Sequence, residues 1–257
     1  KIEQVGTGDF ETKLENYNIL EFQQISDSFN EMTVRIETLI KEVYETQLLV
    51  KEARLQYLQA QINPHFMFNV LTMIAIKVKK HRDEELYQTV TSFAGLMRGK
   101  LFRRNEVEIK LKEEMEIAGF YLYLQSERFK DIITYNIEWE SDEIKECYVP
   151  RLCIEPIVEN AVIHGLEPKG TEGRIRVAIR EASEDSINIV VEDDGVGFNV
   201  NEMDDRKDNK NPRVGVMNIQ RLIRNLYGDK YGVLFQSEIG KGTIVTVCLP
   251  MRKDRTV

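Results

Sequence analysis

The 257-residue chain is poor in the features that mark several large protein classes. Its three cysteines, Cys147, Cys153 and Cys248, are an odd number at spacings that match no metal site, which argues against a disulfide scaffold and a zinc site. No apolar run approaches the ~18 residues of a membrane-spanning helix. Positive charge is also scarce, because 35 lysines and arginines against 43 acidic residues give a formal net charge of −8. That balance argues against a general binder of nucleic acid or of anionic membranes.

The rest of the composition is that of a globular protein. Hydrophobic residues make up 42% of the chain, enough for a sizeable core, and the length suggests roughly two domains. The few cysteines fit a reducing, cytosolic compartment. The chain begins at Lys1, in mid-pattern and without a methionine, so we expect it to be a fragment of a longer protein.

The first long feature is a heptad repeat, in which apolar or small residues recur at alternating steps of three and four. This 3.5-residue period predicts a supercoiled helix that buries its seam against a partner helix. The seam would be on the order of 80 Å long. The next helical stretch, residues 84–102, is too short to cover it within a monomer, so we expect a parallel homodimer. The seam residues are Phe22, Ile25, Phe29, Met32, Ile36, Leu39, Val43, Thr46, Val50, Ala53, Tyr57, Ala60, Pro64, Met67, Leu71, Ile74 and Val78.

A second amphipathic helix follows a polar break at residues 79–83. Its apolar stripe has helical spacing, and two such helical hairpins, one from each subunit, would form a four-helix bundle. The stripe consists of Leu86, Val90, Phe93, Met97 and Leu101.

From about Leu111 the sequence predicts an α+β two-layer sandwich, with one layer of helices over one mostly antiparallel sheet. A very polar stretch, residues 199–212, interrupts this part of the chain. We expect helices at residues 111–129, 151–164 and 216–227, and strands at 132–139, 174–180, 187–192, 233–238 and 243–249.

The segment Asn63-Pro64-His65-Phe66-Met67-Phe68-Asn69 lies within the heptad pattern. Proline inside a helix removes a backbone hydrogen bond and costs about 3 kcal/mol, so its presence beside a histidine suggests a position kept for a purpose. With Pro64 on the seam, His65 lies ~100° around the helix, where its imidazole could meet solvent or a docked domain. Asn69, one turn on, could fix the imidazole tautomer, and a neutral imidazole is a competent nucleophile toward phosphorus. The alternative is a histidine that only caps the kink, and these residues alone favour it.

A second group of residues favours the catalytic interpretation of His65 over the capping one. Glu159-Asn160 lies in a predicted helix, and an asparagine oxygen suits Mg²⁺, which takes few protein ligands and several phosphate oxygens. Asp193 ends a predicted strand and enters a D-x-G-x-G turn with Gly195 and Gly197. An aspartate beside glycines can accept a hydrogen bond from an exocyclic amine such as that of adenine.

Two further glycine motifs follow in the chain. Gly215 opens a predicted helix, where free backbone N–H groups can point at a phosphate. Gly240-Lys241-Gly242-Thr243 lies between the last two predicted strands. Alone, the D-x-G-x-G motif could be a plain turn and Gly-Lys-Gly-Thr a hairpin loop, but the four pieces in this order and on these elements are a strong signal.

Together these motifs resemble the Bergerat (GHKL) ATP-binding fold. The Asn-Pro-His-Phe-x-Phe-Asn segment narrows the resemblance to sensor histidine kinases of the LytS/YesM type, and the similarity extends over essentially the whole chain. Gly8-Asp9-Phe10 and Phe29-Asn30-Glu31-Met32 resemble the second half of a HAMP signalling linker, and residues 121–129 match the connection of this subfamily to its ATPase domain.

The resemblance implies a role for each matching residue. His65 would accept the phosphoryl group, with Asn69 beside it, and Asn160 would bind Mg²⁺. Asp193 would recognise adenine, and residues 199–212 would form a lid over ATP. The nucleotide pocket would further include Gly195, Gly197, Arg213, Gly215, Gly240, Gly242 and Thr243.

The sequence departs from the family pattern at three positions. Phe66 stands where many histidine kinases have an acidic residue after the phosphorylated histidine, which leaves Glu159 as a candidate general base or as a partner of a nearby cation. Ile163 replaces a phosphate-binding lysine, so that charge would come from Lys169, Arg213 or the lid, or be absent. Arg213 also replaces the first glycine of the phosphate loop.

The expected protein is the cytoplasmic part of a bacterial membrane-anchored sensor histidine kinase. It would use ATP and Mg²⁺ to phosphorylate His65 and pass the phosphoryl group to an aspartate of a response regulator receiver domain. The expected domains are a partial HAMP linker (1–40), a signalling coiled coil (41–62), a dimerisation and phosphotransfer hairpin (63–106) and a catalytic ATP-binding domain (107–257). Two alternatives stay open: an ATPase of the same fold, and a degenerate nucleotide-sensing scaffold without phosphohistidine chemistry.

Overall fold

A computed structural model describes residues 20–61, 64–101, 106–130, 132–183, 185–199 and 212–255. The chain forms two compact units, Lys1–Asn63 and Pro64–Val257. Of the expected HAMP motifs, Gly8-Asp9-Phe10 lies outside the described residues. None of the described helices is both long enough and apolar enough to cross a membrane.

In the first unit, the described residues form one long helix, α2 (Leu20–Gln61), of 42 residues. Most of its described heptad side chains are exposed in the single chain, although an apolar seam gains stability only by burial against a partner. The exposed seam residues of α2 include Phe22, Ile25, Met32, Leu39, Val43 and Val50.

Residues 62 and 63 lie outside the described part of the chain, so the expected continuity of the helix through Pro64 stays a prediction. Helix α2 ends at Gln61, and the next helix, α3, spans Pro64–Lys80. Pro64 is therefore the first residue of a helix, where a missing N–H breaks no internal hydrogen bond and the fixed φ suits helical geometry. The second unit begins at this same residue.

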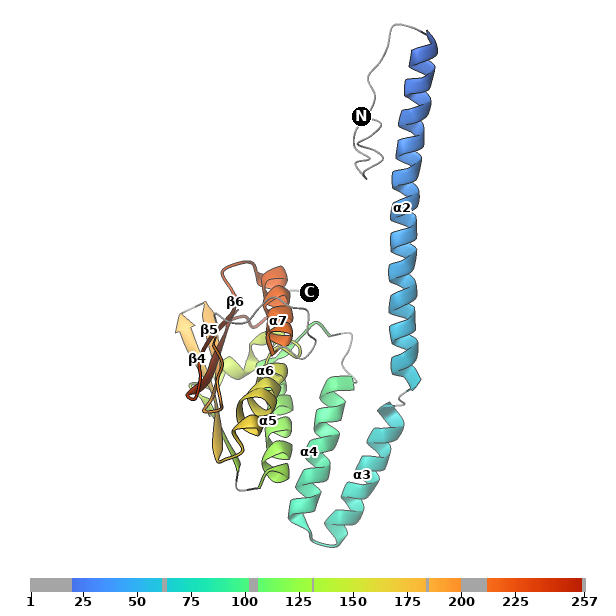
Figure 1. Cartoon of the computed structure of the whole chain (residues 1–257). Helices are drawn as coiled ribbons and strands as arrows, with labels where there is room; N and C mark the ends of the chain where they lie inside the picture. The colour runs from blue at the N-terminus through green and yellow to red at the C-terminus, as the bar shows by residue number, and fades with distance from the viewer. Residues whose placement is uncertain are drawn as a thin grey trace. The chain divides into compact units, whose positions relative to one another are not determined.

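Helices α3 and α4 (Glu84–Leu101) form the predicted hairpin, with the short break at residues 81–83 between them. Asp83 starts α4, because its carboxylate accepts a hydrogen bond from the backbone N–H of Leu86 at 3.0 Å. The two helices lie side by side and run in opposite directions. The end of α4 is therefore level with the beginning of α3 (Figure 1).

Helix α4 also packs against α5 (Leu111–Arg128), which belongs to the α/β part of the unit. Two glycines allow this close approach. A Cβ atom on Gly95 would lie 2.4 Å from the ring of Phe120, and one on Gly99 would lie 2.5 Å from Cγ1 of Ile117. Gly95 and Gly99 are four residues apart and so lie on one face of α4.

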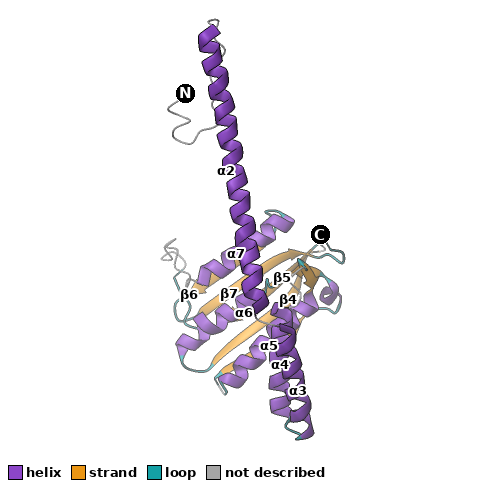
Figure 2. Cartoon of the chain, turned by 90° about the vertical axis from the view of Figure 1, so that its right-hand side faces the viewer, coloured by secondary structure: helices purple, strands orange, loops and turns teal. Residues whose placement is uncertain are grey.

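The α/β part is a two-layer sandwich, as predicted (Figure 2). Helices α5, α6 (Glu155–Asn160) and α7 (Pro212–Tyr227) cover one face of a five-stranded sheet. The strand order is β2-β4-β5-β7-β6, and only the β2–β4 pair is parallel. The strands are β2 (Ile133–Trp139), β4 (Gly173–Ser183), β5 (Ser186–Asp193), β6 (Gly232–Glu238) and β7 (Gly242–Pro250).

The core lies between this sheet and its helices. Burying each large aliphatic side chain contributes about 1.5–3 kcal/mol, so this layer supplies much of the stability of the fold. The fully buried side chains include Leu122, Ile157 and Ile223 from the helices and Ile175, Ile179, Ile187 and Ile189 from the strands.

Two features were not predicted. The expected helix over residues 151–164 is regular only in α6; it then widens into a π-helical turn, η2 (Ala161–Leu166), and a 3₁₀ turn, η3 (Glu167–Lys169). Short strands β1 (Glu108–Lys110) and β3 (Tyr148–Pro150) pair beside α5. They were missed because three-residue strands carry almost no periodic signal.

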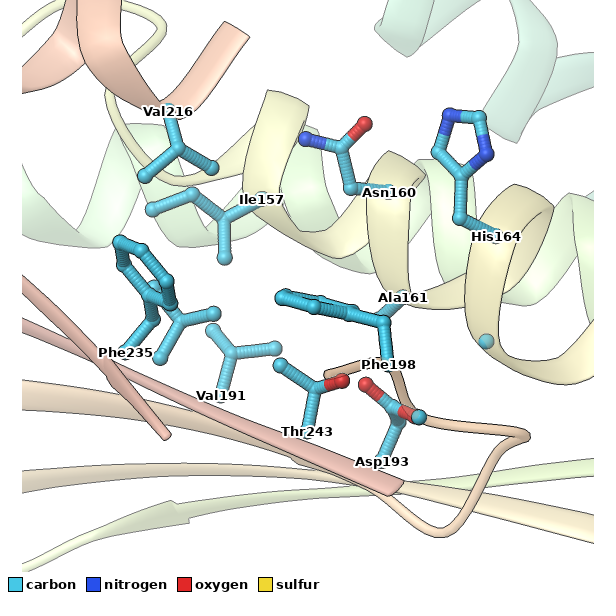
Figure 3. Close-up of a pocket in the computed structure, with 13 residues that line it drawn as sticks. Ile157, Asn160, Ala161, His164, Val191, Asp193, Phe198, Val216, Phe235 and Thr243 are labelled. Atoms are coloured by element: carbon cyan, nitrogen blue, oxygen red, sulfur yellow. The ribbon is translucent and has the colours of Figure 1, made fainter. Parts of the chain in front are cut away.

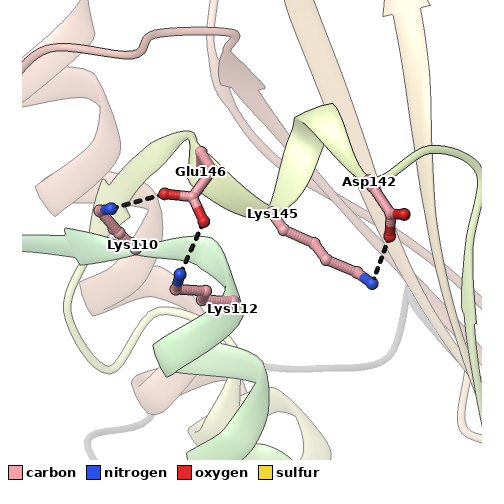
Figure 4. Close-up of polar contacts among 5 residues, drawn as sticks. All are labelled: Lys110, Lys112, Asp142, Lys145 and Glu146. Atoms are coloured by element: carbon pink, nitrogen blue, oxygen red, sulfur yellow. Dashed lines mark hydrogen bonds and ion pairs between the residues drawn. The ribbon is translucent and has the colours of Figure 1, made fainter.

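A surface ion cluster joins the start of α5 to the short helix η1 (Glu143–Glu146). Glu146 accepts hydrogen bonds from Lys110 and Lys112, while Asp142 pairs with Lys145 (Figure 4). The two lysines hold the pKa of the Glu146 carboxyl at about 2, well below its ordinary value. All these side chains are at least about one third exposed, so the cluster fixes geometry more than it adds stability.

The glycine contacts of α4 yield a stability prediction. Gly99→Ala should lower the free energy of unfolding, because overpacking costs about 1–3 kcal/mol while alanine regains at most about 1 kcal/mol of helix propensity. The matched control is Gly119→Ala in α5, where a Cβ atom would lie 3.8 Å from Ile137, an ordinary contact. Urea titrations should separate the two variants by about 2 kcal/mol; equal stability would contradict the close α4–α5 packing.

Candidate nucleotide-binding site

A pocket lies between the α6–η2 helix and the sheet, with about 590 Å³ of empty space, part of it open to solvent (Figure 3). Four of the predicted site residues line it: Asn160, Asp193, Gly197 and Thr243. They come from helix α6, from strand β5 and the turn that follows it, and from strand β7, three regions that are far apart in the sequence. The other lining residues are Ile157, Ala161, His164, Gly165, Val191, Phe198, Val216, Phe235 and Val245.

Asp193 is the buried polar centre of this pocket. It is the last residue of β5, and only 5% of its surface is exposed. Its Oδ1 accepts a hydrogen bond from the backbone N–H of Gly195 at 2.9 Å, and the backbone N–H of Thr243 also donates to the carboxylate. Burial raises the pKa of Asp193 to about 6, although these two donors oppose the shift.

Glycines surround Asp193 because there is no room for side chains. A Cβ atom on Gly165 would lie 2.6 Å from Oδ1 of Asp193, and one on Gly242 would lie 1.9 Å from its carbonyl oxygen. A Cβ on Gly195 would lie 2.3 Å from the backbone of Gly165. Gly197 has a φ of +60°, a left-handed conformation that glycine adopts without strain.

Backbone hydrogen bonds hold the D-x-G-x-G turn on two sides. The N–H of Val196 donates to the carbonyl of Gly165 at 3.0 Å, and the N–H of Gly240 donates to the carbonyl of Val196 at 2.7 Å. The N–H of Phe198 donates to Oγ of Ser237 at 3.0 Å. Gly240, which does not line the pocket, thus fixes the turn that does.

The remaining walls are apolar and aromatic. Figure 3 shows the ring of Phe198 lying across the pocket, between the helix that carries Asn160 and the strands that carry Val191 and Thr243. The ring centroids of Phe198 and Phe235 are 6.3 Å apart. Apolar walls around one buried acceptor suit a flat heteroaromatic ring that carries an amine.

Asn160 lies on the opposite side of the pocket from Asp193 (Figure 3). It is the last residue of α6 and leads into the π-helical turn, which redirects the following residues. His164 projects from the same side of this helix and also lines the pocket. Gly215, in the first turn of α7, lies beside Asn160, and a Cβ atom there would be 3.5 Å from Nδ2, an ordinary contact.

The start of α6 is anchored by a buried carboxylate from α5. Glu114 is fully buried, and its two oxygens accept hydrogen bonds from the N–H groups of Leu152 and Ile154 at 2.9 and 3.0 Å. Leu152 has a φ of +55°, a strained conformation for leucine that these contacts hold in place. Burial raises the pKa of Glu114. The anchor fixes where α6, and therefore Asn160, begins.

Several other predicted residues lie away from the pocket lining. Glu159 is next to Lys100 of α4, with 3.7 Å between the carboxylate and the ammonium, so it has the cation partner that the sequence offered as one alternative. Lys169 pairs with Asp194 at 3.0 Å, and Ile163 is exposed.

The hairpin residues and the lid are only partly described. His65 is the second residue of α3, and its side chain lies outside the described part of the structure. Asn69 is exposed one turn further along α3. Arg213 lies in the first turn of α7, with its side chain not described, and residues 200–211 of the expected lid lie outside the described residues.

Sequence reasoning did not name the nine other lining residues as site residues, and for three of them the reason can be given. Gly165 is a glycine inside a helical pattern, a signal that points to a close backbone approach. Phe198 directly follows the D-x-G-x-G turn, so its place in the motif could have drawn attention. His164 was not among the site residues named from the sequence, because the π-helical turn that brings it to the pocket has no sequence signature.

The metal-binding side chains at the pocket suit an ion that binds together with a nucleotide. Among the described residues, no group of three or more His, Cys, Asp or Glu side chains could hold a metal ion. Asn160 supplies one hard amide oxygen at the pocket, which suits Mg²⁺, because that ion takes most of its ligands from phosphates and water.

Two protein-family models match this chain, one over the helical hairpin and one over the α/β part. Residues 53–133 match the family model for "Histidine kinase", and residues 150–253 match the family model for "Histidine kinase-, DNA gyrase B-, and HSP90-like ATPase". The first match spans the end of α2, the hairpin and α5, and the second spans every residue of the pocket.

Three curated relatives are similar over most of the chain. "Sensor histidine kinase YesM" of Bacillus subtilis (strain 168) is 33% identical over 88% of this chain and 38% of its own length. "Sensor histidine kinase YpdA" of Escherichia coli (strain K12) is 29% identical over 80% of this chain and 37% of its own. "Sensor protein LytS" of Oceanobacillus iheyensis is 28% identical over 84% and 37%. This chain thus spans less than two fifths of these relatives, and it belongs to the sensor histidine kinases of the LytS/YesM type.

Proposed function

We propose that the protein is a sensor histidine kinase that transfers the γ-phosphoryl group of ATP to His65 and then to an aspartate of a response regulator receiver domain. The observation that carries this proposal is the pocket, where a buried carboxylate and a hard amide ligand face each other across apolar walls. The carboxylate side of the pocket suits the adenine of ATP, and the amide side suits its phosphates with Mg²⁺. The kinase portion would lie on the cytoplasmic side of a bacterial membrane, as the resemblance implies.

In this proposal the adenine ring enters at Asp193. Its exocyclic amine donates to the carboxylate, while the N–H groups of Gly195 and Thr243 already hold that carboxylate in place. The phosphates extend toward Asn160 and Gly215 at the start of α7, where backbone N–H groups attract anions. Mg²⁺ would bind Asn160 and the phosphates and neutralise charge during transfer.

Phosphoryl transfer then requires His65 to meet the γ-phosphorus in line. The lone pair of an imidazole nitrogen forms the N–P bond as the P–O bond to the β-phosphate breaks, and ADP leaves with that electron pair. Asn69, one turn along α3, would orient the ring. Glu159 is the candidate acceptor for the imidazole proton. Positioning and charge neutralisation supply most of the rate enhancement.

The proposed domain organisation keeps the boundaries expected from the sequence: a HAMP-like linker (1–40), a coiled coil (41–62), the phosphotransfer hairpin (63–106) and the ATP-binding domain (107–257). The exposed heptad seam of α2 supports a parallel homodimer. A change in packing of that seam would carry the signal and alter whether the ATP-binding domain reaches His65.

The central test is labelling with γ-³²P-ATP. The wild-type chain should acquire an acid-labile, alkali-stable label, and His65→Gln should remove it while leaving ATP binding unchanged, because a phosphohistidine is the only product that requires that imidazole. His81→Gln, in the exposed turn between α3 and α4, is the matched control. Label that survives in His65→Gln would refute the assignment.

This experiment also decides between the proposal and its rivals. An ATPase of the same fold would release phosphate without labelled protein, and a degenerate scaffold would bind ATP saturably with neither product. Phosphate release and ATP binding are measured together with labelling because Ile163 and Arg213 replace residues typical of the family.

Asp193→Asn should weaken ATP binding by about 10- to 100-fold, the loss expected for a hydrogen bond to a charged group. The effect should depend on pH. Because the pKa of Asp193 is raised to about 6, lowering the pH through 6 protonates the wild-type carboxyl and removes the ionised acceptor. The ratio of wild-type to variant affinity, measured by titration calorimetry, should therefore fall toward one from pH 8 to pH 5. A ratio that stays constant over this range would exclude Asp193 as the adenine acceptor.

Removal of Mg²⁺ should act through Asn160. In the wild-type chain, EDTA should lower ATP affinity, whereas in Asn160→Ala the affinity should already be reduced by at least about tenfold and respond little to EDTA. His164→Ala is a useful comparison, because it changes the neighbouring turn without removing the amide oxygen. An unchanged EDTA response in Asn160→Ala would show that the metal is held elsewhere.

A further inference from the structure

The end of helix α4 and the start of helix α6 are joined by reciprocal contacts. Lys100, in the last turn of α4, places its ammonium 2.8 Å from Oε1 of Glu155, the first residue of α6. In the opposite direction, Arg151 donates hydrogen bonds to the carbonyls of Gly99 and Lys100, at 2.7 and 2.8 Å. We refer to Lys100, Arg151 and Glu155 as the clasp.

Each contact of the clasp brings an opposite charge to a buried carboxylate or to the carbonyls at a helix end. The last carbonyls of α4 have no partner within the helix and carry the negative end of the helix dipole, which an arginine neutralises well. The Glu155 side chain is only 2% exposed, and its carboxylate has Lys100 as a cation partner. Burial raises the pKa of Glu155, and Lys100 opposes that shift.

Further contacts along α4 and α5 hold the hairpin against the α/β part of the unit. Gly95 and Gly99 accommodate Phe120 and Ile117 of α5 on one face of α4. At the other end of α4, Lys130 pairs with Glu85. The clasp therefore closes one end of a continuous contact between the hairpin and the α/β part of the unit.

The position of the clasp relates it to the chemistry. Helices α3 and α4 are antiparallel and have 17 and 18 residues, so the last turn of α4 is level with the first turn of α3, where His65 lies. Glu155 starts the six-residue helix that ends at Asn160. One ion pair thus joins the His65 end of the hairpin to the helix that carries the proposed metal ligand, and Lys100 also approaches Glu159 to 3.7 Å.

We propose that Lys100 is a positioning residue for phosphoryl transfer: through Glu155 it holds helix α6, and with it Asn160, at the end of the hairpin that carries His65. This inference rests on the proposed function. Lys100 acts by placing the bound nucleotide relative to His65, so its loss should reduce the rate of transfer and leave nucleotide binding unchanged.

The test uses the whole chain with ATP and Mg²⁺. Lys100→Met should lower the rate of His65 labelling at saturating ATP by roughly 10- to 100-fold, with the KM for ATP changed by less than about twofold. Lys100→Arg should restore most of the rate, because it keeps the cation. The double variant Lys100→Met/Glu155→Gln removes the pair without leaving a buried charge, and it should fold like the wild type and label as slowly as Lys100→Met.

The control is Lys110→Met. Lys110 also pairs with a glutamate, Glu146, and its side chain is 35% exposed against 34% for Lys100, but it contacts no hairpin residue in its ion pair (Figure 4). Its loss should leave the labelling rate unchanged. An unchanged or increased rate in Lys100→Met would overturn the proposal, an increase meaning that the clasp restrains the domain. A parallel loss of rate and ATP affinity would also overturn it.

Hydrogen exchange distinguishes failure of this inference from failure of the proposed function. If the wild type acquires no label, the proposed function fails, and the clasp is then judged by the backbone amides of residues 155–160. Faster exchange there in the double variant, with no change in strand β7, would support the clasp as the link that positions α6. Identical exchange in the double variant and the wild type would overturn it.

Discussion

The nucleotide pocket depends on the burial of one carboxylate against backbone. Asp193 is enclosed so closely that Cβ atoms on Gly165 or Gly242 would overlap it. A buried aspartate is costly unless it accepts hydrogen bonds, and the N–H groups of Gly195 and Thr243 satisfy that requirement. These contacts bring two strands, one turn and one helix together, so the geometry of the pocket follows from placing this single group.

The opposite wall of the pocket is positioned by different means. Helix α6 is too short to be stable alone, and it is held by Glu114, which binds the N–H groups of Leu152 and Ile154 just before it, and by the clasp to α4. Because the clasp residues belong to the hairpin and to the α/β part, the position of Asn160 depends on both. This gives a physical route by which a change in the hairpin could reach the nucleotide.

The predicted elements were most accurate where the pattern was long. The hairpin helix, α5 and the strands β2, β4, β5, β6 and β7 lie within a few residues of their expected bounds. The heptad continues on both sides of Pro64, and because residues 62 and 63 lie outside the described part of the chain, a kink there stays a prediction. Strands β1 and β3 were too short to produce a period. The dimer, the HAMP-like linker and the lid stay predictions.

The sequence by itself determined the residue types of the site and their order along the chain, because glycines and an aspartate at element ends are local signals. It also determined the family, through motifs whose spacing is fixed by the fold. The tertiary structure alone decided that Gly165, His164 and Phe198 join the pocket, and that Lys100 meets Glu155. Those contacts depend on a π-helical turn and on close helix packing between segments tens of residues apart, and neither leaves a periodic trace in sequence.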